Sequence, residues 1–114
     1  MGRIVPLGLA FSMESPLPIS IPMDRIAEFC KRNRVRRLSL FGSVLREDFT
    51  PTSDIDVLVE FEPGTRIGFF GFQGLEDELS ALLGRRVDLN TPNSLSRYFR
   101  DQVLREARTL HVAA

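Results

Sequence analysis

The sequence predicts an α+β fold, in which a small mixed β-sheet is backed by helices. Three observations support this prediction. Apolar residues alternate with polar ones through residues 54–61, which is typical of a strand. Apolar residues recur at helical spacing through residues 69–83. Strand-like and helix-like stretches also alternate along the chain, whose 114 residues fit one domain.

The N-terminal residues lack any sustained hydrophobic period. Pro6, Pro16 and Pro18 interrupt this stretch, so residues 1–21 are expected to form a flexible leader. The folded domain is then expected to span residues 22–114.

The order of elements in this domain follows from periodicity and from glycine and proline positions. We expect a helix over 22–34, a strand over 36–41, a short helical turn over 44–47, a strand over 54–61, a helix over 69–83, a strand over 85–89 and a helix over about 93–108. Gly84 is expected to end the long helix. The last helix is expected to bury Leu95, Phe99 and Val103.

The first helix carries an apolar stripe that contains the chain's one cysteine. The stripe consists of Met23, Ile26, Phe29 and Cys30, so Cys30 is interpreted as a buried apolar residue. A single cysteine forms no intramolecular disulfide, and no stretch reaches the about 20 apolar residues that span a membrane. We therefore expect a cytoplasmic protein.

Charge argues against nucleic acid as the main partner. Acidic and basic side chains number 15 each, whereas phosphate neutralisation normally requires a basic excess. The basic stretch between Lys31 and Arg37 is by default the solvated end of a helix. Phe69, Phe70 and Phe72 exceed what one helix face buries, so an exposed remainder would suggest a protein interface.

Two carboxylates in the clearest strand carry the most chemical information. Asp54 and Asp56 lie two residues apart and therefore point to the same side of the strand. Their repulsion would be relieved by a divalent cation, and Mg²⁺ is commonly held by carboxylates together with substrate phosphates. Asp88 on the next strand would supply a third carboxylate, a set that fits two Mg²⁺ ions.

A candidate phosphate site precedes these carboxylates. Gly42 and Ser43 lie where a strand gives way to a helical turn, where backbone N–H groups can approach a phosphate closely. The Ser43 hydroxyl could add a hydrogen bond, and Arg46 could pair with the same triphosphate. For Arg46, a structural salt bridge is an equally good interpretation.

Each of these features has a simpler interpretation when it stands alone. The pair Asp54 and Asp56 by itself is more typical of a solvated strand start, and an acidic residue such as Asp88 on an amphipathic strand is usually just exposed. The combination with Gly42-Ser43 favours a nucleotide site instead.

The combination resembles the signature of the DNA polymerase beta-like nucleotidyltransferase superfamily. Gly42-Ser43 is followed by Arg46 and then by Ser53-Asp54-Ile55-Asp56 at the family's spacing. Over residues 23–112 the chain is similar to the minimal nucleotidyltransferase group, known as antitoxins of HEPN toxins. The resemblance implies that Asp54, Asp56 and Asp88 bind metal, and that Gly42 and Ser43 hold the triphosphate. Arg46 and Ser53 are further candidates for nucleotide binding. One departure is Leu45-Arg46-Glu47, where many members have Ala-Arg-Gly.

The resemblance also implies an activity, namely Mg²⁺-dependent transfer of AMP from ATP to a tyrosine of a partner HEPN toxin, whose RNase activity is thereby silenced. The alternative is a binding module that neutralises its partner by occlusion and needs no catalysis. A nucleic-acid-modifying transferase is a third hypothesis, and it requires the arginines between Arg32 and Arg37 to lie beside the carboxylates. The sequence does not decide the oligomeric state, and a homo-oligomer is possible.

Overall fold

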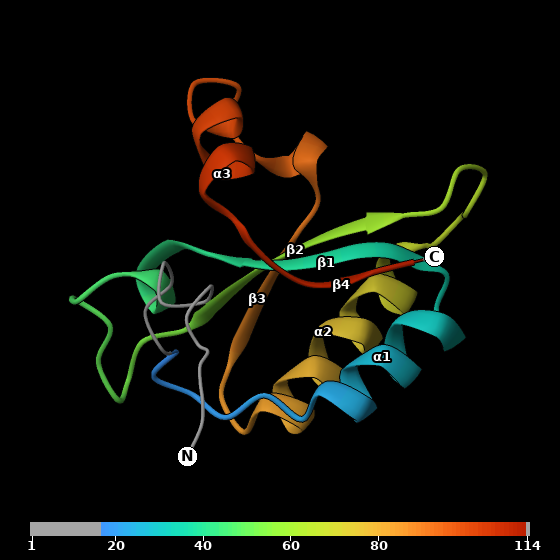
Figure 1. Cartoon of the computed structure of the whole chain (residues 1–114). Helices are drawn as coiled ribbons and strands as arrows, with labels where there is room; N and C mark the ends of the chain where they lie inside the picture. The colour runs from blue at the N-terminus through green and yellow to red at the C-terminus, as the bar shows by residue number, and fades with distance from the viewer. Residues whose placement is uncertain (1–16, 114) are drawn as a thin grey trace, which may run out of the picture.

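A computed structural model describes residues 17–113 of the chain (Figure 1). Its elements are α1 (Met23–Arg32), β1 (Val35–Phe41), the 3₁₀ turn η2 (Gly42–Leu45), β2 (Ile55–Phe61), α2 (Phe69–Leu83), β3 (Val87–Asn90), the 3₁₀ turn η3 (Pro92–Ser94), α3 (Arg100–Glu106) and β4 (Arg108–Val112).

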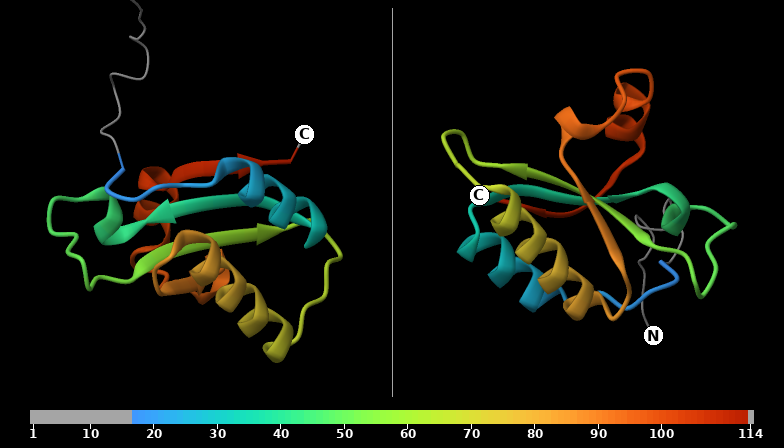
Figure 2. Two further views of the ribbon diagram at one scale, coloured as in Figure 1. Left: turned by 90° about the horizontal axis from the view of Figure 1, so that it is seen from below. Right: turned by 180° about the vertical axis from the view of Figure 1, so that it is seen from behind.

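The strands form one mixed sheet in the order β3-β2-β1-β4. Strand β1 is antiparallel to both β2 and β4, whereas β2 and β3 are parallel. Helices α1 and α2 lie side by side on one face of the sheet, and α3 stands on the opposite face (Figures 1 and 2). The predicted mixed sheet backed by helices is thus confirmed.

The hydrophobic core lies between the sheet and the α1–α2 layer. It comprises Ile26, Phe29, Cys30, Val35, Leu38, Leu40, Val44, Ile55, Val57, Val59, Leu75, Leu79, Leu83, Val87 and Leu89. Cys30 is fully buried, which confirms its interpretation as a buried apolar side chain, and this burial raises the pKa of its thiol to about 12. Met23, expected on the same stripe, is instead 48% exposed, because it occupies the first turn of α1.

Helix α2 has the predicted bounds, and its end shows why. Gly84 adopts a φ of +67° and donates its N–H to the carbonyl of Ser80, the left-handed cap that glycine favours. Phe72, Leu75 and Leu79 face the core, whereas Phe69 and Phe70 in the first turn are 78% and 86% exposed.

Replacing Gly74 by alanine is expected to stabilise the protein by about 0.5–1 kcal/mol. Gly74 lies inside α2, and a Cβ there would meet no atom within 4 Å. Alanine therefore restricts the unfolded chain without a steric cost in the helix. Urea unfolding followed by circular dichroism measures the difference, and a destabilised variant would contradict this account of the helix surface.

The predicted helix over 93–108 is wrong in extent. Thr91 and Ser94 form a reciprocal capping box around η3, and Leu95 then takes an extended conformation with a ψ of 145°. The Arg100 guanidinium donates to the carbonyls of Pro92 (2.8 Å) and Leu95 (3.1 Å), which stabilises this irregular segment. Only Arg100–Glu106 is α-helical, and none of its residues is buried.

Strand β4 is the other departure from the predicted order. Residues Arg108–Val112 pair with the free edge of β1, which leaves the backbone of that strand satisfied on both sides. The stretch is short, and only the presence of β1 beside it favours a strand over a continued helix.

The N-terminal boundary at residue 21 stays a prediction. Residues 1–16 and Ala114 lie outside the described residues. Leu17, Ile19 and Ile21 pack against the core, so these last residues of the predicted leader contact the domain. Between residues 17 and 113, no helix has the length and apolar character needed to cross a membrane.

Candidate active site

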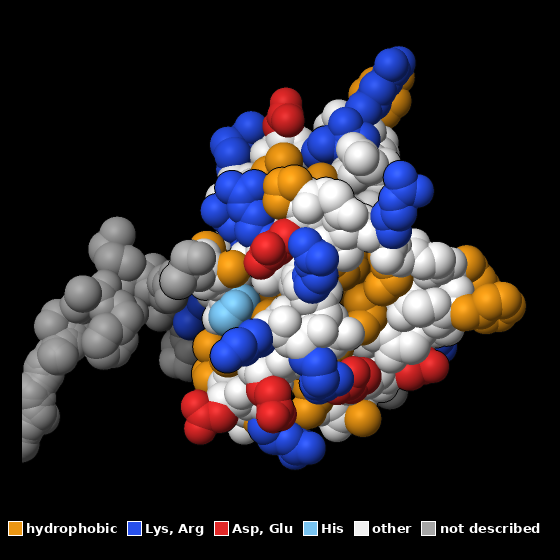
Figure 3. All heavy atoms as spheres, turned by 90° about the vertical axis from the view of Figure 1, so that its right-hand side faces the viewer, with side chains coloured by type: hydrophobic (Ala, Val, Ile, Leu, Met, Phe, Trp, Pro, Cys, Tyr) orange, Lys and Arg blue, Asp and Glu red, His pale blue; other side chains and the backbone are white. Residues whose placement is uncertain are grey.

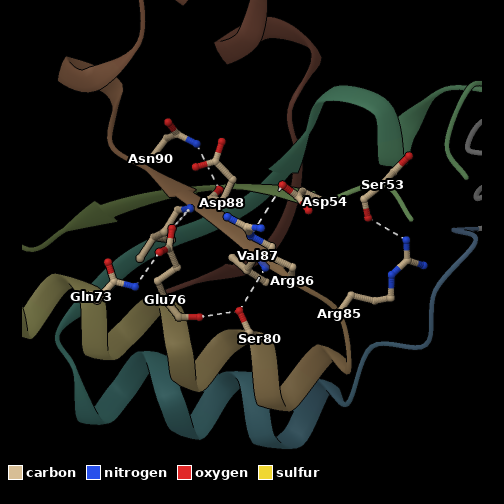
Figure 4. A network of polar contacts seen from close by, with 11 residues as sticks. Ser53, Asp54, Gln73, Glu76, Ser80, Arg85, Arg86, Val87, Asp88 and Asn90 are labelled. Atoms are coloured by element: carbon tan, nitrogen blue, oxygen red, sulfur yellow. Dashed lines mark hydrogen bonds and ion pairs between the residues drawn. The ribbon is translucent and has the colours of Figure 1, made fainter. Parts of the chain in front are cut away.

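Asp56 and Asp88 form the centre of the candidate site. They are direct neighbours in the parallel register of β2 and β3, so their side chains share one face of the sheet. The pKa of Asp56 is raised to about 6, first by burial and then by the negative charges of Asp88 and Asp54. Figure 4 shows the Asp88 carboxylate pointing away from α2, toward the side where α3 lies.

Asp54 lies immediately before β2, close enough for its charge to act on Asp56. Its carboxylate is 3.9 Å from the guanidinium of Arg86, which is largely exposed (Figure 4). Within residues 17–113, no three acidic, His or Cys side chains already form a group that could hold a metal ion. An exposed ion pair of this length contributes little to stability, so Asp54 can exchange Arg86 for a cation at small cost.

Gly42 brings the predicted phosphate loop into contact with this acidic pair. Its φ is +78°, and Phe41, the residue before it, pairs with Asp56 across β1 and β2. A Cβ on Gly42 would overlap Oδ2 of Asp56 and lie 3.1 Å from its Cγ. Glycine is thus required both by the backbone conformation and by the close approach of the carboxylate.

Ser43 is the second residue of the turn η2, and Arg46 directly follows the turn. The turn η2 begins at Gly42 rather than at residue 44 as expected, and the Ser43 carbonyl accepts the Arg46 N–H at 2.9 Å. The Arg46 side chain is 3.4 Å from Asp48, and its positive charge opposes the rise in the pKa of Asp56. The salt-bridge interpretation of Arg46 is found in the structure, and its contact with a phosphate stays a prediction.

Ser53 is less clearly part of the same site. Its hydroxyl bonds the Thr50 N–H (2.9 Å) and the Thr50 hydroxyl (3.0 Å). Arg85 donates to the carbonyls of Thr50 and Ser53 and lies over the ring of Phe49. Ser53 and Arg85 therefore fix the loop that leads into Asp54 (Figure 4), and a nucleotide contact by Ser53 stays a prediction.

Two residues of α2 that sequence reasoning missed hold β3 in place. The Val87 N–H donates to the Ser80 hydroxyl (3.0 Å), and the Leu89 N–H donates to Glu76 Oε2 (2.8 Å). Strand β3 is an edge strand, so these side chains satisfy backbone groups that β2 does not. Asp88 lies between the two anchored residues (Figure 4). The only signal in the sequence was a pair of polar residues at helical spacing, which is ordinary on a solvated helix face.

Replacing Glu76 by alanine is expected to cost about 1–3 kcal/mol of stability, because the part-buried Leu89 N–H loses its acceptor. We also expect about 10-fold lower transfer activity, because Asp88 loses one of its two flanking anchors. Urea unfolding and initial rates measure the two effects. Glu76→Gln keeps an acceptor and should restore most of both, whereas Asp77→Ala, on the exposed face of α2, should change neither. An unaltered rate in Glu76→Ala would contradict the positioning role.

The basic stretch lies away from the carboxylates. Arg32 pairs with Glu78 at 2.7 Å, and Arg37 lies 4.0 Å from Glu60 near the start of β1. Gly42 follows the opposite end of that strand. The arrangement required by the nucleic-acid hypothesis is therefore not found among these residues.

Two proteins of known sequence are similar to most of this chain. The chain is 39% identical over 83 residues to a protein of Methanocaldococcus jannaschii inferred to be a protein adenylyltransferase, covering 73% of this chain and 87% of that one. It is 42% identical over 79 residues to protein adenylyltransferase MntA of Thermococcus cleftensis, covering 69% and 78%.

Solved structures agree with the fold. One of an inferred minimal nucleotidyltransferase superposes with a TM-score of 0.62 at 38% identity, covering 75% of this chain and 85% of the other. A toxin–antitoxin structure with AMP-PNP superposes with a TM-score of 0.65 over 82% and 75% at 23% identity, which supports the fold alone. Residues 23–110 match the nucleotidyltransferase domain family. The chain therefore belongs to the nucleotidyltransferase domain family of transferase enzymes.

Proposed function

We propose that the chain transfers AMP from ATP, with Mg²⁺, to a tyrosine hydroxyl of a partner HEPN toxin, and so acts as an antitoxin. The observation that carries the proposal is the packing of Gly42 against Asp56, with Asp88 beside it. A backbone loop suited to phosphate thereby borders a crowded set of carboxylates. Among the relatives, the Thermococcus cleftensis protein named protein adenylyltransferase MntA supports the protein acceptor.

Carboxylates are ligands that suit a divalent cation, and Asp54 would have to leave Arg86 to join Asp56 and Asp88 around it. Asp56 carries a pKa raised to about 6, partly by Asp88 and Asp54, so the protein alone does not neutralise this cluster. Hard oxygen ligands of this kind are those that Mg²⁺ prefers. Asp54, Asp56 and Asp88 would hold the ion, which when bound would supply charge neutralisation for the triphosphate and the leaving pyrophosphate.

The protein's own groups would bind the triphosphate and orient the acceptor hydroxyl. Gly42 and Ser43 would hold the triphosphate, and Arg46 would pair with one of its oxygens. Asp88 would orient the acceptor hydroxyl and take its proton. The acceptor oxygen forms a bond to the α-phosphorus while the bond between that phosphorus and the bridging oxygen breaks, and pyrophosphate leaves.

A protein acceptor agrees with an exposed aromatic pair outside the site. Phe69 and Phe70 contact each other edge to face, with ring centroids 5.4 Å apart, at the start of α2. Figure 3 shows hydrophobic side chains protruding at the edge of one face of the molecule. Such a pair is typical of a protein interface, and it also favours the alternative, neutralisation of the partner by occlusion.

Transfer of label from ATP labelled at its α-phosphate separates the two functions. The acceptor offered is the product of the gene next to this one, and Asp54→Ala/Asp56→Ala is the comparison variant. Label on the partner that requires Mg²⁺ and disappears with the variant is the expected result. Tight binding of the partner by both proteins without any label would contradict transfer and favour occlusion.

A further inference from the structure

Tyr98 is the only tyrosine of the chain, and its side chain is 80% exposed. The sequence predicts a longer helix here that buries Leu95, Phe99 and Val103, but none of the three is buried, and the segment forms a turn before α3 instead. This segment stands out from the sheet on the face where α3 lies (Figures 1 and 2). Tyr98 therefore presents a phenol hydroxyl to other molecules.

Hydrogen bonds hold this turn in place. The Ser96 carbonyl accepts the N–H groups of Phe99 (3.0 Å) and Arg100 (2.9 Å). The Ser96 hydroxyl accepts the Tyr98 N–H (3.3 Å). The Arg100 guanidinium fixes the preceding segment through two further backbone carbonyls. Because backbone groups on both sides of Tyr98 are paired, its ring is carried by a fixed turn rather than by a loose loop.

Arg97 completes the surroundings of the hydroxyl. Its guanidinium donates to the Tyr98 hydroxyl at 3.4 Å and lies over the ring, 5.3 Å from the centroid. Because the arginine is the donor in this contact, the phenolic proton is left for transfer to a base. The positive charge would stabilise the negative charge that develops on the phenolic oxygen as it attacks a phosphorus atom. These properties suit an acceptor hydroxyl.

The direction of the ring decides which active site it can reach. Ser96 and Phe99, close to Tyr98 on either side, line a cavity of about 370 Å³ together with Gly42. Tyr98 does not line this cavity, so its ring points away from the acidic site of its own chain. The paired backbone of the turn opposes folding back. The hydroxyl is therefore placed to enter the site of a second copy of the protein.

We propose that Tyr98 accepts AMP, which a second copy of this protein transfers to it from ATP. The inference rests on the proposed function and adds a self-modification site to it. The Tyr98 hydroxyl oxygen forms a bond to the α-phosphorus, and the bond between that phosphorus and the oxygen bridging to the β-phosphorus breaks. Pyrophosphate leaves with that electron pair, and the phenolic proton passes to Asp88 of the second copy.

Charge complementarity favours this encounter between two copies. Asp54 and Asp88 are exposed, so the acidic site is open to a side chain from outside, and a bound triphosphate adds further negative charge. Arg97 is exposed beside the hydroxyl, so its charge would draw the turn toward that site. After transfer, the same guanidinium would pair with the new phosphodiester.

Incubation of the protein alone with Mg²⁺ and ATP labelled at its α-phosphate tests the proposal. Tyr98→Phe keeps the acidic site but lacks the hydroxyl, whereas Asp54→Ala/Asp56→Ala lacks the acidic site but keeps the hydroxyl. Each variant alone should take up no label. When the two are mixed, label should appear on the Asp54→Ala/Asp56→Ala protein, which a purification tag distinguishes. Peptide mass spectrometry should place the adenylyl group on Tyr98.

Two further variants test the surroundings of the hydroxyl. Arg97→Gln should slow self-labelling about 10-fold, the loss expected for one hydrogen bond from a charged group, while labelling of the neighbouring gene's product stays unchanged. Phe70→Tyr, made in the Tyr98→Phe background, moves the phenol to a position on α2 that is 86% exposed. This protein should stay unlabelled, because exposure alone does not make an acceptor.

Each other outcome overturns the proposal in a recognisable way. If the wild type alone takes up no label while the neighbouring gene's product does, Tyr98 is not an acceptor and the proposed function stands. Label that persists in Tyr98→Phe would place self-modification on another hydroxyl. A labelled wild type with an unlabelled mixture would show transfer within one chain. Equal labelling after the move to position 70 would show that the turn does not select its tyrosine.

Labelling of the neighbouring gene's product also separates this inference from the proposed function. If neither the wild type nor that product is labelled, the proposed function fails and this inference with it. Because Tyr98 is exposed, Tyr98→Phe should label that product at the wild-type rate, which shows that the variant is folded and active.

Discussion

Replacing Asp56 by asparagine is expected to reduce AMP transfer about 1000-fold and to make the metal-free protein more stable at neutral pH. The loss follows from removing the central member of the proposed metal site, since metal-assisted charge stabilisation is worth several kcal/mol in such reactions. The gain follows from the crowding of Asp56 by Asp88 and Asp54. Asparagine keeps the shape of the side chain but removes one of the repelling charges.

The pH dependence of the gain follows from the raised pKa. The folded protein holds the Asp56 proton up to about pH 6, whereas in the unfolded chain the ordinary value is 3.8. Between these values the folded state binds more protons, so the free energy of unfolding falls as the pH rises through this window. The full cost is present above pH 6 and absent below pH 4. Because the carboxyl is only half-buried, solvent screening reduces the gain for asparagine to about 1 kcal/mol.

Thermal unfolding in EDTA measures the gain, expected as a rise of about 4–8 °C in Tm at pH 7.5 that disappears near pH 4. Added Mg²⁺ should raise the Tm of the wild type more than that of the variant. The control Asp77→Asn changes an exposed carboxylate of α2 and should leave the Tm and its pH dependence as they are. An asparagine variant that is less stable than the wild type in EDTA would contradict the crowding of the carboxylates.

Local patterns predicted the elements that form the core. The alternation in β2, the apolar stripe of α2 and the cap at Gly84 each depend on residues close together in the chain, and all three are found as expected. Leu58 shows the limit of this reasoning. It shares the face of Asp56 and would be exposed on a one-sided sheet, yet it is buried, and η3 contacts β2. No local pattern predicts that a second layer covers this face.

In the candidate site, too, some features follow from local patterns and others depend on how the chain packs. Asp54, Asp56 and the turn at Gly42 could be located because two strands and their spacing define them. The contact between Gly42 and Asp56 depends on the register of β1 against β2, which the sequence does not specify. Glu76, Ser80 and Arg86 act through contacts with β3 and Asp54 that only the packed structure forms.

Replacing Gly42 by alanine is expected to lower transfer activity about 100-fold and to destabilise the protein by about 2–3 kcal/mol. Two costs are involved. A positive φ is unfavourable for alanine by about 1–2 kcal/mol. The new methyl group would also overlap Oδ2 of Asp56, so either the carboxylate or the loop must move. Displacement of a catalytic group by about 1 Å is enough for a 100-fold loss.

Gly64 offers a matched control that separates the two costs. Its φ is +83°, close to the +78° of Gly42, but a Cβ there would meet nothing within 4 Å. Gly64→Ala should therefore lose only the conformational part, about 1 kcal/mol, and should keep full activity. In an Asp56→Ala background the carboxylate is gone and only the contact with the Cβ of residue 56, 3.3 Å away, is left, so Gly42→Ala should then cost little more than Gly64→Ala does. Urea unfolding of the wild type, Gly42→Ala, Gly64→Ala, Asp56→Ala and the variant that combines Gly42→Ala with Asp56→Ala measures this coupling. Equal costs for Gly42→Ala in both backgrounds would show that the loop and the carboxylate are not in contact, and the proposed site would lose the geometry on which it depends.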